Sequence, residues 1–220
     1  MSNIWFTGDT HFCHNKDFLY TPRGVETVDN MNDLIVENWN RVVRPEDTVY
    51  HLGDIALNDT TAAIKYINAL NGSIIWFLGN HDSPKRVEEV LRNCPNVKLH
   101  SDRYATNIEI KNLHFYISHY PTLTANFDDK HFSRHVINFH GHTHQKTNWK
   151  DPTNPFMYHV GLDSHNVTPV NLDEAISDIK QRWYEVEKLP PALKPEDTYP
   201  FTFNDKDALK IIFEGDSNDN

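Results

Sequence analysis

The sequence predicts a mixed α/β sandwich, and three observations support this fold class. Short apolar runs alternate with amphipathic helical segments in the first half of the chain. In the second half, strand-like runs follow one another more directly, with fewer helices between them. Hydrophobic residues make up 38% of the 220 residues, which is enough for a folded core. We expect one domain over residues 1–187 and a C-terminal extension at 188–220, of unassigned role and with a disordered tail.

Apolar runs of four or five residues mark the strands of the first half. They occupy residues 4–7, 49–52 and 74–78, and a glycine follows each run directly. Because glycine allows the backbone to turn sharply, each strand is expected to end at that point.

Three amphipathic helices accompany these strands. The first has apolar residues spaced by threes and fours over 31–43, with Asp29 as its expected N-cap and Pro45 as its stop. The other two are expected at residues 60–70 and 84–93, and proline is the first residue of the latter.

The second half of the chain begins with an expected hairpin. Residues 104–110 and 113–117 are its strands, and Lys111-Asn112 is its turn. Two further strands are expected at residues 136–139 and 157–160, and a helix with an acidic first turn at 172–186.

Histidine is unusually frequent in this chain, with 14 residues against only 2 cysteines. Two cysteines cannot build a disulfide framework or a four-cysteine zinc site. Imidazole and carboxylate groups therefore remain as ligands, a combination that suits catalytic Mn, Fe, Ni or Zn. An ordinary surface position is the alternative interpretation for most of these histidines.

The chain is acidic, with 21 basic and 31 acidic side chains and a formal net charge of −10. A chain with this charge lacks the excess of positive side chains that binds anionic membranes, and long duplex nucleic acid is disfavoured as a partner for the same reason. No run of about 18 apolar residues is present to span a membrane, and no signal peptide is apparent. We expect a cytoplasmic protein.

Residues that commonly bind metals follow the ends of five apolar runs. Four runs stop at a glycine that precedes such a residue, in Gly8-Asp9, Gly53-Asp54, Gly79-Asn80 and Gly141-His142, and the fifth ends at His119. The carboxyl ends of neighbouring strands in an open α/β sheet converge on one crevice. We therefore expect these side chains to form one site.

Two pairs of candidate ligands are two residues apart, namely Asp9 with His11 and His142 with His144. Residues at this spacing in an extended segment point the same way, so each pair is expected to bind as a pincer. A lone Asp-x-His motif is more often a turn with an exposed histidine. The ordered set of motifs favours a metal site.

That ordered set resembles the calcineurin-like metallophosphoesterases, whose motifs are D-x-H, G-D, G-N-H-[DE], H and G-H-x-H. The corresponding residues here are Asp9-x-His11, Gly53-Asp54, Gly79-Asn80-His81-Asp82, His119 and Gly141-His142-x-His144. The later segment Val160-Gly161-Leu162-Asp163 is similar to a group of small bacterial and phage phosphoesterases. The resemblance implies a four-layer α/β/β/α sandwich with a dinuclear site at the strand ends. It implies two divalent ions, with Mn favoured over Fe, Ni or Zn.

The resemblance also implies roles for individual residues. One metal ion would take Asp9, His11, Asp54 and His144, and the other would take Asp54, Asn80, His119 and His142. Asp54 would bridge the two ions, because a carboxylate has two oxygens.

The remaining candidates lie around these ligands. His81 would protonate the leaving oxygen or stabilise charge that develops there. Asp82 would help to orient the site, with a helix-start residue as the alternative. His14 and Arg23 are candidates for substrate contact, whereas His51 and His140 are expected to be structural.

One departure from the family bears on the activity. Phosphoprotein phosphatases extend the second motif to G-D-x-x-D-R-G, but Leu57 and Asn58 stand at the Asp and Arg positions here. A protein phosphatase is therefore disfavoured. The leading hypothesis is a metal-dependent phosphodiesterase with a metal-bridging hydroxide as nucleophile, acting on a phosphoester such as a nucleotide or cyclic nucleotide. The alternatives are a phosphomonoesterase for small metabolites and a non-catalytic interaction scaffold.

Overall fold

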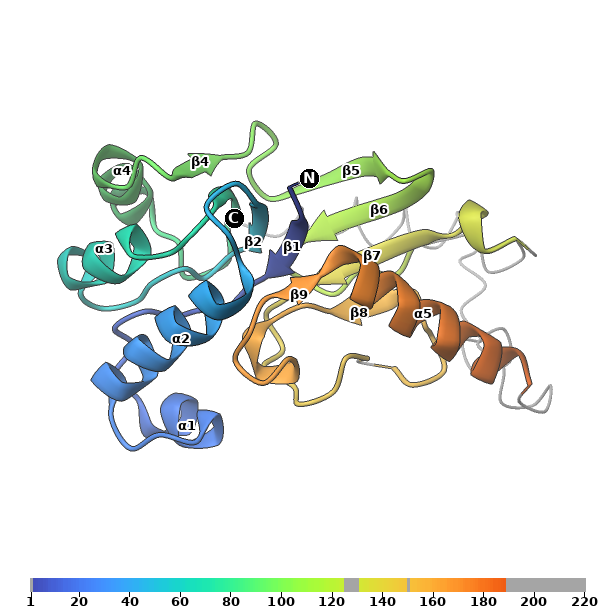
Figure 1. Ribbon diagram of the computed structural model, residues 1–220, viewed down its shortest axis with the longest axis horizontal. Helices are drawn as coiled ribbons and strands as arrows, with labels where there is room; N and C mark the ends of the chain where they lie inside the picture. The colour runs from blue at the N-terminus through green and yellow to red at the C-terminus, as the bar shows by residue number, and fades with distance from the viewer. Residues whose placement is uncertain (1, 125–130, 150, 189–220) are drawn as a thin grey trace, which may run out of the picture.

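The computed structural model describes residues 2–124, 131–149 and 151–188, which form two β-sheets with flanking helices (Figure 1). The first sheet has the order β4 (Val97–Leu99), β3 (Ser73–Phe77), β2 (Thr48–Leu52), β1 (Ile4–Thr7) and β9 (Val170–Asn171). Its strands are parallel except β9, which pairs with β1 in the antiparallel sense.

The second sheet has the order β5 (Ala105–Ile110), β6 (Leu113–Ser118), β7 (Val136–His140) and β8 (Met157–His159). Here β5 is the antiparallel edge strand, and the others are parallel. The hairpin turn at Lys111-Asn112 is confirmed. Both residues have positive φ angles, 55° and 60°, as a two-residue turn of this hand requires.

The helices are α1 (Asp17–Tyr20), α2 (Val28–Val42), α3 (Thr60–Asn68), α4 (Pro84–Asn93) and α5 (Leu172–Glu187). Short 3-10 turns occur at η1 (Thr21–Arg23), η2 (Phe132–Arg134) and η3 (Leu162–Ser164). The predicted N-cap of α2 was wrong. Thr27 caps it by accepting a hydrogen bond from the amide of Asn30, so Asp29 lies inside the first turn.

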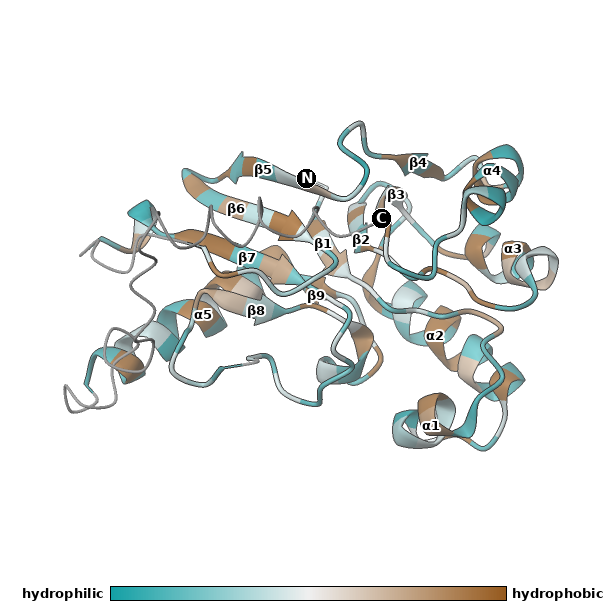
Figure 2. Cartoon of the chain, turned by 180° about the vertical axis from the view of Figure 1, so that it is seen from behind, coloured by the Kyte–Doolittle hydropathy of each residue, from teal (hydrophilic) through white to brown (hydrophobic). Residues whose placement is uncertain are grey.

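Two hydrophobic layers hold these elements together, and alternate residues of β1, β2 and β3 enter different layers. Trp5 packs with Trp39 and other residues of α2, α3 and α4, whereas the adjacent Phe6 packs with Phe139 of the second sheet. The helices alternate between hydrophobic and hydrophilic residues, as packing on one face requires (Figure 2). The predicted α/β sandwich is confirmed.

The parallel strands place their carboxyl ends at one edge, and the loops after β1, β2, β3, β6 and β7 carry the expected ligands. These loops of the two sheets meet, because the His142 amide donates hydrogen bonds of 3.0 and 2.9 Å to the two Asp9 oxygens.

Among the described residues, no helix is long and apolar enough to cross a bilayer. The domain limit near residue 187 stays a prediction, since residues 189–220 lie outside the described residues.

Candidate metal centre

The structure brings all seven expected metal ligands together, and they divide into two groups. In the first group, Nε2 of His11 lies 3.1 Å from Nε2 of His144. The same His11 atom lies 3.6 Å from Oδ2 of Asp54. Asp9 belongs to this group as well, since one of its oxygens lies within 4.8 Å of ligand atoms of both histidines.

The second group surrounds the side-chain oxygen of Asn80. This oxygen lies 2.9 Å from Nε2 of His119 and 2.9 Å from Nδ1 of His142. The two imidazole nitrogens are themselves 3.2 Å apart. Nε2 of His119 also lies 3.5 Å from Oδ2 of Asp54. One carboxylate oxygen of Asp54 therefore faces both groups.

The donor set fits a pair of divalent ions. Ligand atoms about 2.1 Å from one ion lie about 3.0–3.4 Å apart, which is the spacing of the nitrogens within each group. Among the described residues, the ion-pair partners of Asp9 and Asp54 are all histidines, although both carboxylates are buried. Burial raises the pKa of Asp9 to about 7, although His144 opposes the shift. A divalent cation would supply the missing positive charge.

The backbone of these loops is not extended. Asp9, His11, His142 and His144 have φ angles of 57°, 50°, 68° and 47°, in the left-handed region that L-residues rarely adopt. The expectation that each pair points the same way was therefore wrong for the histidine pair: His142 joins Asn80, whereas His144 faces His11. Such backbone strain is typical of functional sites.

Three of the four glycines before ligands are required by close approach. Gly53 has a φ angle of 96°, and a Cβ there would lie 2.5 Å from the backbone nitrogen of Gly79. A Cβ atom at Gly79 would lie 2.2 Å from Oδ1 of Asp54, and one at Gly141 would lie 2.5 Å from Oδ2 of Asp9. Gly8 differs, because a Cβ there would meet its nearest neighbour, the Leu52 carbonyl oxygen, at 3.5 Å.

His81 stands at the open side of the centre. Its ring centroid lies 5.5 Å from that of His11, and the side chain is exposed. Its backbone amide donates to Oδ1 of Asp54 over 2.8 Å, which fixes the loop that carries it. An exposed imidazole beside the ligands is in position to exchange a proton with a bound substrate.

Asp82 is buried beneath this loop and does not start a helix. Its carboxylate accepts from the backbone amides of Asp54 at 2.7 Å, Gly79 at 2.8 Å and Ile55 at 3.2 Å. Ser83 is the residue that caps α4. Asp82 thus holds together the turns that carry Asp54 and Asn80.

The two expected substrate contacts differ in the structure. His14 lies beside the centre, with its ring centroid 5.4 Å from that of His11. Arg23 is buried, and its guanidinium donates to both oxygens of Asp163 and to the carbonyls of Asp9 and Thr10. Because all three guanidinium nitrogens are engaged inside the protein, the expected phosphate contact of Arg23 was wrong.

Asp163 belongs to the site, although no role was predicted for it. It follows β8, the next strand beyond β7, and accepts a 2.7 Å hydrogen bond from Nδ1 of His144. The segment Val160-Gly161-Leu162-Asp163 was the available signal, because it repeats the pattern of an apolar run, a glycine and a carboxylate.

His51 and His140 are both fully buried, in keeping with a structural role. Nε2 of His51 lies 3.0 Å from the Thr10 hydroxyl. Nδ1 of His140 lies 2.9 Å from the carbonyl of Gly141.

Two exposed aromatic rings lie near the centre, each beside a different histidine. Tyr120 is 51% exposed, and its ring packs against His119 and His142 at centroid distances of 5.0 and 4.7 Å. Phe18 is 68% exposed and packs edge-on against His14 at 5.8 Å. Exposed rings of this size are available to contact a ligand at the centre.

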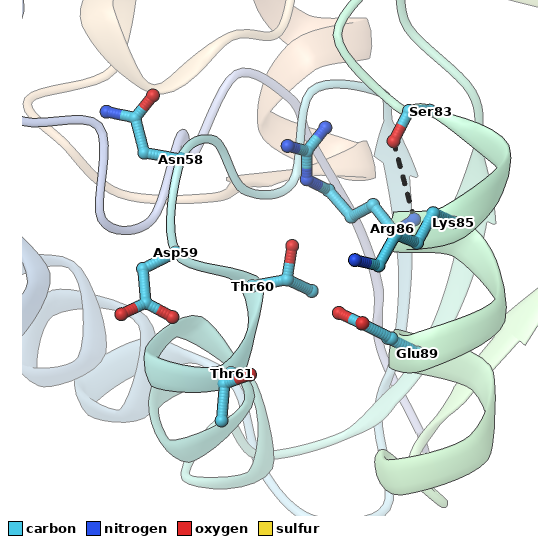
Figure 3. Close-up of a pocket in the computed structure, with 8 residues that line it drawn as sticks. All are labelled: Asn58, Asp59, Thr60, Thr61, Ser83, Lys85, Arg86 and Glu89. Atoms are coloured by element: carbon cyan, nitrogen blue, oxygen red, sulfur yellow. Dashed lines mark hydrogen bonds between the residues drawn. The ribbon is translucent and has the colours of Figure 1, made fainter.

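A groove of about 540 Å³ lies between the first turns of α3 and α4 (Figure 3). It adjoins the centre, because Arg86 in its wall donates a hydrogen bond to the carbonyl of His81. The groove has two basic side chains, Lys85 and Arg86, and two acidic ones, Asp59 and Glu89. These charges balance, so the groove favours neither anions nor cations.

Comparison with known proteins identifies a family model that this chain matches. Residues 3–160 match the model of the calcineurin-like phosphoesterase superfamily domain. The chain is 30% identical over 192 residues to an uncharacterized protein of Methanocaldococcus jannaschii, covering 82% of this chain and 93% of that protein. It is 29% identical over 204 residues to the gene 66 protein of Mycobacterium phage D29, covering 82% of this chain and 99% of that protein.

A solved structure agrees with the fold. A protein of unknown function from Aquifex aeolicus is 23% identical and aligns with a TM-score of 0.59 over 80% of this chain and 99% of that chain. Because the family model spans most of the sequence, the chain belongs to the calcineurin-like phosphoesterase superfamily.

Proposed function

We propose that this phosphoesterase is a dinuclear metal-dependent phosphodiesterase, with one ion held by Asp9, His11, Asp54 and His144. The other ion takes Asp54, Asn80, His119 and His142. The observation that carries the proposal is the position of Asp54, whose Oδ2 lies 3.6 Å from Nε2 of His11 and 3.5 Å from Nε2 of His119. A carboxylate between two groups of nitrogen ligands is suited to bridge two ions.

The charge of the centre favours a diester over a monoester. Two divalent ions, the carboxylates of Asp9 and Asp54 and one hydroxide sum to about +1, which matches the single negative charge of a diester. A monoester carries nearly two negative charges at neutral pH. Arg23 does not add to the charge available to substrate, because its guanidinium is paired with Asp163.

The protein's own residues have separable tasks in this reaction. Bound divalent ions supply a water of lowered pKa and neutralise the phosphoryl oxygens. His81 is exposed beside His11 and donates a proton to the leaving oxygen. Asp82 keeps the Asp54 turn in place through three backbone hydrogen bonds. The donor set of imidazole, carboxylate and amide oxygen accepts Mn²⁺, Fe²⁺, Ni²⁺ or Zn²⁺, and we propose Mn²⁺ on the family resemblance.

A nucleotide diester or cyclic nucleotide is the proposed substrate class. Tyr120 is exposed beside His142, and Phe18 is exposed beside His14. Stacking of a base on an exposed aromatic ring contributes about 1–3 kcal/mol of binding free energy. Tyr120→Ala should raise the KM for a nucleotide diester more than the KM for bis(p-nitrophenyl) phosphate if it stacks a base. Tyr184→Ala is the matched control, because Tyr184 is 58% exposed on α5 and contacts no ligand of the centre.

A reporter comparison tests the reaction itself. We expect kcat/KM with Mn²⁺ to be higher for bis(p-nitrophenyl) phosphate than for p-nitrophenyl phosphate. The reverse order would establish the monoesterase alternative, and no turnover of either ester with any divalent metal would support the interaction scaffold. His81→Gln should slow esters with poor leaving groups, such as phenyl, more than esters with p-nitrophenolate, because only the former need a proton. Equal losses would contradict the role of His81.

A further inference from the structure

Arg23 occupies an unusual position for a charged side chain. It is buried, and its Nε and one terminal nitrogen donate to the two oxygens of Asp163 at 2.9 and 3.1 Å. The guanidinium also donates to the Asp9 carbonyl at 2.6 Å and the Thr10 carbonyl at 2.9 Å. A fork of this kind matches a carboxylate in both geometry and charge. It joins the loop after β1 to the loop after β8.

Asp163 continues this connection to a candidate ligand. Its Oδ2 accepts from Nδ1 of His144 at 2.7 Å, and a carboxylate stabilised by a guanidinium can only accept there. Nδ1 of His144 therefore carries the hydrogen, which leaves the lone pair on Nε2. That nitrogen faces Nε2 of His11, 3.1 Å away. A histidine whose other nitrogen is bonded to a carboxylate is oriented and made a stronger ligand.

The second group of ligands has a different support. Nδ1 of His119 faces the backbone carbonyl of Leu52 at 2.8 Å, so a neutral oxygen takes the place that Asp163 takes for His144. The hydrogen bonds of Arg23 and Asp163 to the metal-binding loops end at Asp9, Thr10 and His144. The buried ion pair thus bears on one of the two groups.

We propose that Arg23 and Asp163 are positioning residues that hold His144 and the Asp9–His11 loop in place for one of the two metal ions. The inference rests on the proposed dinuclear centre. Neither residue touches substrate. Their effect is expected to fall mainly on the ion assigned to Asp9, His11, Asp54 and His144, because their hydrogen bonds end at Asp9, Thr10 and His144.

Metal titration of the full-length, metal-free protein tests this selectivity without any measurement of hydrolysis. Asp163→Asn keeps the shape but replaces one acceptor oxygen with an amide that faces N–H donors. Arg23→Lys keeps the positive charge but loses the paired hydrogen bonds to the two Asp163 oxygens. This variant provides the test if Asp163→Asn does not fold. Asp47→Asn is the matched control, since Asp47 is also buried and accepts from the Asn3 and Arg44 amides and the Trp5 indole. It lies at the opposite end of β1 from the centre, beside Asn3.

We expect calorimetry to give two Mn²⁺ per chain, with Asp163→Asn weakening one of them about 10–100-fold and the other clearly less. Arg23→Lys should weaken the same ion, and Asp47→Asn neither, although it lowers the melting temperature. Equal weakening of both ions, unchanged affinity in both variants, or the same loss in Asp47→Asn would overturn the positioning role. Two bound ions without hydrolysis of any ester would overturn the proposed function alone. A wild-type chain that binds no metal would overturn both.

Discussion

The glycine before Asn80 offers a sharp test of how tightly the centre is built. Replacing Gly79 with alanine adds one methyl group, whose carbon would lie 2.2 Å from Oδ1 of Asp54 and 2.8 Å from its backbone nitrogen. Side-chain carbons essentially never approach another atom closer than 3.0 Å. The Asp54 carboxylate and the backbone at residue 79 must therefore move apart by at least 0.8 Å, the difference between 3.0 and 2.2 Å.

This displacement sets the size of the expected effect. A misplacement of about 1 Å in a reacting group costs about 10²-fold in rate, and overpacking costs about 1–3 kcal/mol of stability. Gly79→Ala should therefore lower kcat/KM for bis(p-nitrophenyl) phosphate about 100-fold and lower the melting temperature. Asp54 is the carboxylate assigned to both ions, so both should bind more weakly in calorimetry.

Gly8→Ala is the matched control, because Gly8 also precedes a candidate ligand. A Cβ at this position would meet the Leu52 carbonyl oxygen at 3.5 Å, an ordinary contact. The substitution should leave kcat/KM within a few-fold of wild type, with a small gain in stability from the less flexible unfolded chain. Equal losses in the two variants, or full activity in Gly79→Ala, would refute the close-approach reasoning.

Three further predictions concern the surrounding structure. Asp82→Ala should lower the free energy of unfolding by about 1–3 kcal/mol for each of the three backbone amides that it leaves without an acceptor. We expect a lower melting temperature and weaker Mn²⁺ binding, and unchanged Mn²⁺ binding would contradict the positioning role of Asp82. Burial, with a smaller contribution from His119, lowers the pKa of His51 to about 3, so the unfolded chain binds the extra proton between about pH 6.5 and 3. Metal-free protein should therefore lose about 1.4 kcal/mol per pH unit as pH falls through this window, and His51→Gln should remove that share in urea titrations; an identical slope in the variant would contradict the assignment. Thr27→Ala should cost about 1 kcal/mol of unfolding free energy in urea, whereas Asp29→Ala should cost less, and the reverse order would restore Asp29 as the cap.

Long amphipathic helices and the strand ends marked by glycine were predictable from the sequence, because each depends on residues close together in the chain. The helix expected at residues 84–93 agrees with α4, and the strands before Gly8 and Gly53 end where expected. The strands β4 and β9 were missed, since three and two residues carry too little periodicity. Their existence depends on pairing with β3 and β1.

The membership of the candidate centre was predictable, but its local geometry was not. Motif order was enough to group Asp9 with His144, because the strands of the two sheets end at a common edge. The left-handed backbone at His142 and His144 has no signal in the sequence, although the family resemblance already assigned the two side chains to different ions. The burial of Arg23 depends on Asp163, 140 residues later in the chain, so sequence spacing could not indicate it.

We propose that two metal ions, with Asp54 as their shared ligand, carry out the hydrolysis. The most direct measurement is turnover of bis(p-nitrophenyl) phosphate by metal-free protein as Mn²⁺ is added in known equivalents. We expect no turnover without metal, a rise that is complete only at two equivalents per chain, and no rise in Asp54→Asn. Full turnover at one equivalent, full activity in Asp54→Asn, or activity in the presence of excess chelator would contradict the claim.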